Sequence, residues 1–166
     1  LAAAAVRKLI AGAGGKTGAQ TRYWQNRIDT KFARALIRQG KMAEGEWHFR
    51  DALERSTREA GANSVPTAKF ALELANVQLR QGRYEDALGQ ASAARTTLEQ
   101  RKAGESANMV YALLLIGWSQ VMAGRFETAI AAFEQRAQTA RDGGGSVVWG
   151  YAMIRTGRAE AALPML

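Results

Sequence analysis

The sequence has 166 residues, of which 47% are hydrophobic and 23% charged, which is enough for one compact domain or a short repeat array with a core and excludes a disordered tail. It has no cysteine and one histidine, which excludes disulfides, thiolate metal sites and a cysteine nucleophile but leaves the cellular compartment open. The net charge is +8, and residues 1–69 carry +7 of it, so this part attracts acidic peptides, nucleic acid or anionic lipid at long range.

The first 20 residues are expected to form the remnant of a helix followed by a linker. Residues 1–11 are rich in alanine, but their apolar run is too short for a signal peptide or a membrane span. The segment GAGGKTG, residues 12–18, resembles a phosphate-binding loop, yet Ile10 stands where that motif needs glycine. We therefore expect no nucleotide site here. Because the sequence starts at Leu1 and stops inside an amphipathic pattern, we also expect it to be a piece of a longer protein.

Four stretches of nine residues repeat one pattern: RQGKMAEGE, RQGRYEDAL, MAGRFETAI and RTGRAEAAL. Their third residues are Gly40, Gly82, Gly124 and Gly157, which are spaced by 42, 42 and 33 residues. Glycine reaches the left-handed conformation that ends a helix without steric cost, and an acid then follows within the first turn of the next helix. Apolar residues recur three and four positions apart on both sides. Each stretch therefore predicts a tight turn between two helices.

The pattern predicts an all-α chain without strands. In chain order, we expect helices over residues 22–39, 43–59, 67–81, 84–101, 106–123, 126–141, 146–156 and 159–166. They make an array over residues 21–166, with hairpins at 21–61, 66–104 and 106–142 and a partial hairpin at 146–166. Small residues upstream of each turn, such as Ala75 and Gly117, let the two helices of a hairpin approach closely. Replacing Gly117 with leucine should therefore destabilise the fold.

These residues resemble the tetratricopeptide repeat family. The third repeat matches the family pattern best, through Leu113, Ile116, Gly117, Gly124, Phe126, Ala129 and Phe133. The first repeat departs from it, since Asp29 and Gly45 stand where the family favours a large apolar residue and alanine. The resemblance implies an α-solenoid of stacked antiparallel helical hairpins in a right-handed superhelix. The 42-residue period exceeds the family's usual length of about 34, as it does in kinesin light chains and in bacterial repeat proteins attached to caspase-like CHAT domains.

The resemblance also implies a binding surface, because the inner wall of such a superhelix is lined by the first helix of each hairpin and binds proteins or peptides. Carried over position by position, the partner-binding residues are Arg27, Arg34, Arg38, Lys69, Asn76, Arg80, Tyr111, Trp118 and Tyr151. The same wall would include Leu72, Leu79 and Val121. Its basic and apolar parts would fit an acidic segment with a hydrophobic anchor. We expect no cofactor, no metal ion and no enzyme activity.

Four other interpretations of these residues stay open. One is that the array docks on and regulates a catalytic domain, for example a CHAT protease-like one, that lies outside this sequence. Another is that Tyr111, Trp118 and Tyr151 pack against a further helix of the full protein. Nucleic-acid binding through the basic first part ranks last, because the aromatic residues there look like packing residues. Glu44, His48 and Asp51 share one helix face and could in principle hold a metal ion, but a solvated charged face is favoured.

Overall fold

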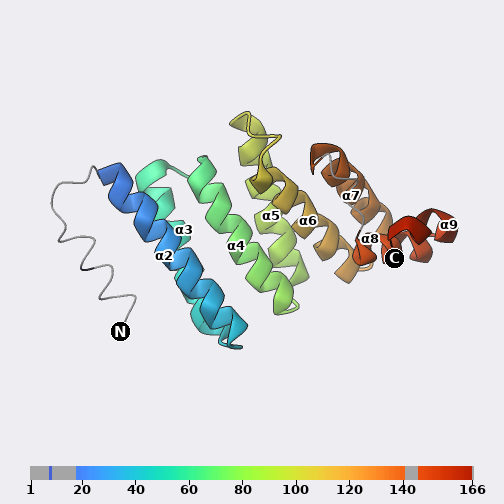
Figure 1. The fold of residues 1–166 in the computed structure, drawn as a ribbon, viewed down its shortest axis with the longest axis horizontal. Coiled ribbons are helices and arrows are strands. Elements are labelled where there is room, and N and C mark those ends of the chain that lie inside the picture. Colours follow the sequence, from blue (N-terminus) through green and yellow to red (C-terminus); the bar gives the residue numbers. More distant parts are fainter. Residues whose placement is uncertain (1–7, 9–17, 141–145, 166) are drawn as a thin grey trace. The chain divides into compact units, whose positions relative to one another are not determined.

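The computed structural model describes residue 8 and residues 18–140 and 146–165. Their secondary structure consists of the helices α2 to α9 and a short 3-10 helix, with no strand among them (Figure 1). They belong to two units, one through Arg55 and one from Ser56 onward. The expected helix remnant and most of the glycine-rich segment fall in residues 1–7 and 9–17, which lie outside the described residues.

The first unit is a helical hairpin of α2, Gly18–Arg38, and α3, Met42–Ala60, whose last residues belong to the second unit. Gly40 joins the helices with a φ of 79°, in the left-handed region that glycine favours. The antiparallel helices approach closely at Gly45, where a Cβ would lie 2.5 Å from Cγ1 of Ile37. The departure from alanine at this position is therefore what the close contact requires.

Asp29, the other departure from the family pattern, is buried in the first unit, with 2% of its surface exposed. Its carboxylate accepts a short hydrogen bond from Nη2 of Arg55 on α3, and Nη1 of Arg55 donates to Oδ2 of Asp51 at 2.9 Å. Such a partner is needed because burying a charged group alone is strongly unfavourable. A carboxylate at this normally apolar position is therefore accommodated by an arginine 26 residues further along the chain.

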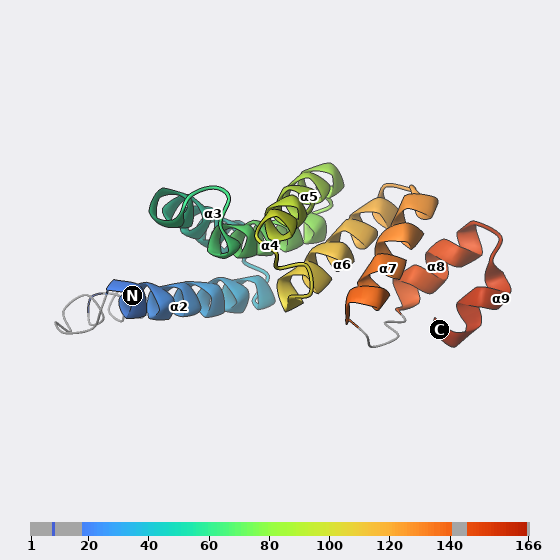
Figure 2. The ribbon, with the colours of Figure 1, turned by 90° about the horizontal axis from the view of Figure 1, so that it is seen from above.

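The second unit stacks three hairpins in chain order. They are α4 and α5 (Val65–Arg80, Tyr84–Gln100), α6 and α7 (Ala107–Met122, Phe126–Ala140), and the short α8 and α9 (Val147–Arg155, Ala159–Ala162), followed by the 3-10 helix η1, Leu163–Met165. Each helix from α4 to α9 contacts the next, and α6 also contacts both α4 and α8 (Figures 1 and 2). Because the first helices of successive hairpins touch, they form one row, which is the stacking of an α-solenoid.

The hairpins of the second unit share their local chemistry at both ends. Serine hydroxyls cap the first helices and accept hydrogen bonds from the backbone N–H three residues later at 3.2–3.3 Å; these caps are Ser64, Ser106 and Ser146. The three turn glycines have φ values of 76–79°, and the residue after each donates its N–H to the carbonyl five residues back at 2.8–2.9 Å. Serine before the first helix and glycine after it therefore set the helix bounds.

The observed helices agree with the expected ones to within one residue except at a few ends. α2 begins four residues early, at Gly18, and α4 begins two residues early because Ser64 caps it. The helix expected over residues 159–166 is instead the four-residue α9 followed by a 3-10 turn, because Pro164 has no N–H with which to continue an α-helix. The expected end of α7 at residue 141 lies outside the described residues.

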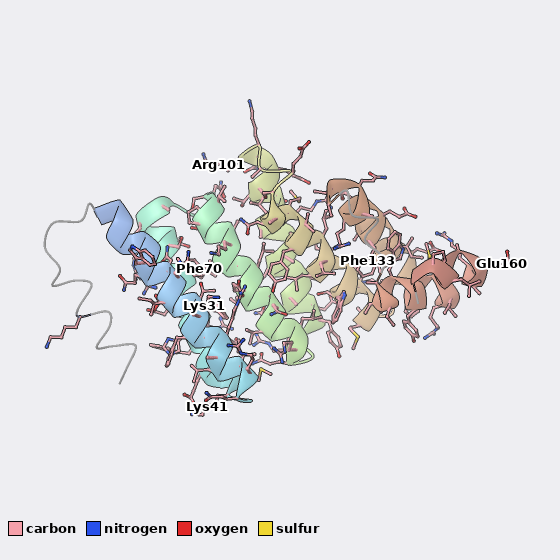
Figure 3. All side chains as sticks on the ribbon, viewed as in Figure 1. Lys31, Lys41, Phe70, Arg101, Phe133 and Glu160 are labelled. Atoms are coloured by element: carbon pink, nitrogen blue, oxygen red, sulfur yellow. The ribbon has the colours of Figure 1, made fainter. Side chains whose placement is uncertain are left out.

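Glycine at position 117 is required by the packing of α6 on α7. A Cβ there would lie 2.6, 2.7 and 2.9 Å from three ring atoms of Phe133, which is only 1% exposed. Figure 3 labels Phe133 among the side chains of the second unit. That ring stacks against Trp149 of α8, with ring centroids 6.2 Å apart. Trp149 is itself buried, with 6% of its surface exposed. The core of the last two hairpins therefore has no room for a larger residue at position 117.

Ion pairs join successive turns of the second unit. Arg125 pairs with Glu85 of the preceding hairpin at 2.8 Å, and Arg158 pairs with Glu127 at the same distance. In both pairs the arginine directly follows its turn glycine, and the glutamate lies three residues after the previous turn glycine. These exposed pairs contribute little stability. They show that the turn ends of the hairpins meet in a repeating register.

Candidate protein-interaction surface

The row formed by α4, α6 and α8 presents equivalent residues of successive hairpins at matching levels. Six residues before the turn glycine stand Asn76, Trp118 and Tyr151. Two residues before it stand Arg80, Met122 and Arg155. These helices contact one another in turn and share the register of their turns. Residues of one level therefore stand at corresponding positions on adjacent helices.

Large apolar side chains are exposed on α6 and α8. They make up the α6/α8 apolar surface, which consists of Trp118 (41% exposed), Met122 (52%), Val147 (64%), Tyr151 (44%) and Ile154 (43%). A single exposed apolar residue is ordinary, but a group of them on neighbouring helices is typical of an interaction site. Two of the five, Trp118 and Tyr151, are residues that the sequence assigned to partner binding.

Arg155 lies beside this surface and is held in place. Its Nη1 donates a hydrogen bond to Oη of Tyr151 at 2.7 Å, and its Cζ lies 4.6 Å from the ring centroid of Phe126. The rings of Tyr151 and Phe126 meet edge to face with centroids 5.9 Å apart. Phe126 packs in turn against the core of the last two hairpins. The exposed guanidinium of Arg155 is therefore anchored to the core through an aromatic ring.

The other predicted residues of the second unit differ in exposure. The structure leaves Arg80 exposed and partly buries Lys69, Asn76 and Tyr111. Three apolar residues that were expected on the inner wall are instead buried: Leu72, Leu79 and Val121. On α4 the reason is that 11 of its 16 residues are buried, so its apolar side chains belong to the core. Exposed apolar side chains occur on α6 and α8 instead.

In the first unit, the predicted arginines lie along one face of α2. Arg27, Arg34 and Arg38 are exposed, as is Lys31 between them. Steps of three and four residues place all four on the same face, which we name the α2 basic stripe. The guanidinium of Arg27 also lies over the exposed Trp24, 5.5 Å from the ring centroid. Sequence reasoning missed Lys31 and Trp24, although helical spacing alone would have found the lysine.

The metal-ligand cluster considered from the sequence does not form. Asp51 is paired with Arg55, and the ring of His48 packs edge-on against Phe32 and Trp47, with centroids 4.9 Å away in both cases. Within the described ranges, no three His, Cys, Asp or Glu side chains are placed to hold a metal ion. The helices of these ranges also include none with the length and apolarity needed to cross a bilayer.

Comparison with known proteins agrees with the helical hairpins. A family model described as "Tetratricopeptide repeat" matches residues 24–100. Residues 24–100 therefore contain tetratricopeptide repeats. A solved structure of similar fold is the crystal structure of BtubC (BKLC) from P. vanneervenii, with a TM-score of 0.79 at 15% sequence identity; the match covers 99% of this chain and 67% of that one. No curated protein matches the sequence.

Tetratricopeptide repeats are generally protein-interaction modules, and their helical-repeat fold is typically non-catalytic. The all-α architecture expected from the turn motifs is confirmed, with hairpins stacked as in a solenoid. The matched range ends with α5, although the hairpin of α6 and α7 carries the most complete set of family residues. The α6/α8 apolar surface therefore belongs to the part of the array that the matched tetratricopeptide repeats do not reach.

Proposed function

We propose that the chain is a protein-interaction scaffold and that the α6/α8 apolar surface binds a hydrophobic anchor of a partner protein or peptide. The observation that carries the proposal is the exposure of five large apolar side chains on two helices that contact each other. The free energy falls when a partner covers exposed apolar surface of this kind. Trp118 is expected to dominate the affinity, since tryptophan is enriched among residues that carry most of the binding energy of an interface.

The basic residues favour an acidic partner. Arg80 and Arg155 lie on the same row of helices as the apolar surface, and the α2 basic stripe adds four cations in the first unit. Charges of this sign speed the approach of an acidic segment and repel basic ones, whereas buried apolar contacts supply most of the affinity. The proposed ligand is therefore a peptide segment that combines acidic residues with a large apolar side chain.

The test is to select short random peptides displayed on phage against the purified chain and to measure affinities of the enriched peptides by fluorescence anisotropy. Trp118→Ala should weaken binding by about 2 kcal/mol, or roughly thirtyfold. Trp47→Ala is the matched control. Trp47 is also an exposed tryptophan, at 60%, but it lies on α3, the second helix of its hairpin, and not on the α6/α8 apolar surface. Circular dichroism checks that both variants stay helical. Equal affinities of the two variants would exclude the α6/α8 apolar surface as the binding site.

The contribution of the α2 basic stripe is tested separately with Arg34→Glu. Reversing one exposed charge should lower the association rate for an acidic peptide severalfold at low salt and much less at high salt, because salt screens exposed charges. Stopped-flow fluorescence measures this rate. If Arg34→Glu leaves the rate unchanged at low salt, the stripe does not attract the partner.

A further inference from the structure

Arg155 differs from the other arginines of the hairpin turns in what it contacts. Arg125 and Arg158 each pair with a glutamate, whereas no acid among the described residues pairs with Arg155. Its guanidinium is instead held by Phe126 and by the hydroxyl oxygen of Tyr151. An exposed arginine normally loses much conformational freedom when it binds an anion. Here that freedom is already restricted before any ligand arrives.

We infer that Arg155 and Tyr151 form a preorganised carboxylate-binding site, which takes the side chain of an aspartate or glutamate in the partner. This inference rests on the proposed function and specifies its ligand. Because Oη of Tyr151 accepts from Arg155, its own O–H is free to donate in another direction. A carboxylate beside the pair can then accept from both the guanidinium and the phenol. Ion pairing and hydrogen bonding to a charged acceptor act together at this point.

The level of Arg155 in the row fixes where the acid lies relative to the anchor. Met122 occupies the equivalent position on α6, and Trp118 lies one turn before it. Packed helices have axes about 8–10 Å apart, which an extended peptide spans with about three residues. A peptide whose apolar anchor covers Trp118 and Met122 therefore places an acid on Arg155 about three residues from that anchor.

Phe126 explains why arginine rather than lysine suits this position. The planar guanidinium lies over the Phe126 ring and still presents several N–H donors at its edge, whereas an ammonium group has no flat face to stack. Glu127, the neighbour of Phe126, is paired with Arg158. Because this pairing offsets its negative charge, Glu127 competes less with an incoming carboxylate for Arg155. The site is therefore built for one additional anion.

The experiment uses the peptides selected on the whole chain, synthesised with amidated C-termini so that only side chains carry carboxylates. Each acidic peptide is compared with its Glu→Gln or Asp→Asn form, against the wild-type chain and Arg155→Met. We expect amidation of the acid nearest the anchor to weaken wild-type binding about tenfold, the loss of one charge-assisted hydrogen-bond pair, and to have little effect on Arg155→Met. Tyr151→Phe, which keeps the ring, should lose about threefold for the acidic peptide only.

Arg95→Met is the matched control, since it removes the same charge from α5, outside the row of α4, α6 and α8, and should leave the affinity unchanged. The inference is wrong if selected peptides bind in a Trp118-dependent way but ignore both the acid-to-amide change and Arg155→Met; the proposed function then stands. If no peptide binds, or if Trp118→Ala has no effect, the proposed function fails and the inference with it. Tighter, Arg155-dependent binding of fluorescent single-stranded DNA than of the acidic peptides would also overturn it.

Discussion

The contact between Gly117 and Phe133 gives a sharp test of how the hairpins pack. In Gly117→Ala the new methyl group would lie 2.6–2.9 Å from three atoms of a ring that is buried and stacked on Trp149, so the ring cannot simply swing away. Overpacking of this kind costs about 1–3 kcal/mol, whereas alanine gains about 1 kcal/mol over glycine inside a helix. The net expectation is a loss of about 1 kcal/mol.

Gly89→Ala measures the helix-propensity part of this effect alone, and its difference from Gly117→Ala gives the steric part. Gly89 also lies inside a helix, α5, but a Cβ there has nothing within 4 Å, so only the helix-propensity gain remains. Thermal unfolding followed by circular dichroism should show Gly89→Ala melting about 2–4 °C above the wild type and Gly117→Ala about as far below it. In a double-mutant cycle, Phe133→Leu should remove most of the cost of Gly117→Ala, because the ring atoms are gone.

The reasoning is refuted if Gly117→Ala melts at or above the wild type while Gly89→Ala behaves as expected. It is also refuted if the cost of Gly117→Ala is the same with leucine at position 133. Either result would mean that the helices separate without penalty and that glycine is not needed for their close approach.

Three further stability predictions use the same melting assay. Gly124→Ala should cost about 1 kcal/mol purely through its φ of 76°, since a Cβ there touches nothing; an unchanged midpoint would show that the turn relaxes freely. Ser106→Ala removes the N-terminal cap of α6 and should cost about 1 kcal/mol, which Ser106→Asp should largely restore. Arg55→Met removes the arginine that pairs with the buried carboxylate of Asp29 and should cost about 3 kcal/mol or more; a loss below about 1 kcal/mol would contradict the buried ion pair.

Most of the fold could be predicted because its determinants are local. A turn glycine with φ near 79° and a serine cap each act within one helix end, so a few adjacent residues reveal them. The small residue at position 117 was also predictable from its distance to the turn. Burial was harder to foresee on α4, where Leu72 and Leu79 look like wall residues by position but are covered in the fold.

The features that sequence reasoning missed depend on residues distant in the chain. Asp29 looks like a defect in the repeat until Arg55 is seen to pair with it, and nothing in the sequence links the two positions. Arg155 resembles any other arginine before a turn, because its contact with Phe126 spans 29 positions and two helices. Charged and aromatic groups that meet across hairpins are thus the least visible part of the candidate site.

The turns of the second unit keep a constant register. The proposed anchor and carboxylate positions can therefore be located by counting residues back from each turn glycine. The last two steps between turn glycines differ in length, 42 and 33 residues, yet the Arg125–Glu85 and Arg158–Glu127 pairs have the same geometry at 2.8 Å. The difference of nine residues must therefore be absorbed away from the turns, toward the opposite ends of the helices. Residues two and six positions before a turn glycine keep their level whatever the hairpin length. A partner that contacts several hairpins of the second unit therefore meets residues at regular positions near the turns. The apolar side chains and Arg155 are exposed at this end.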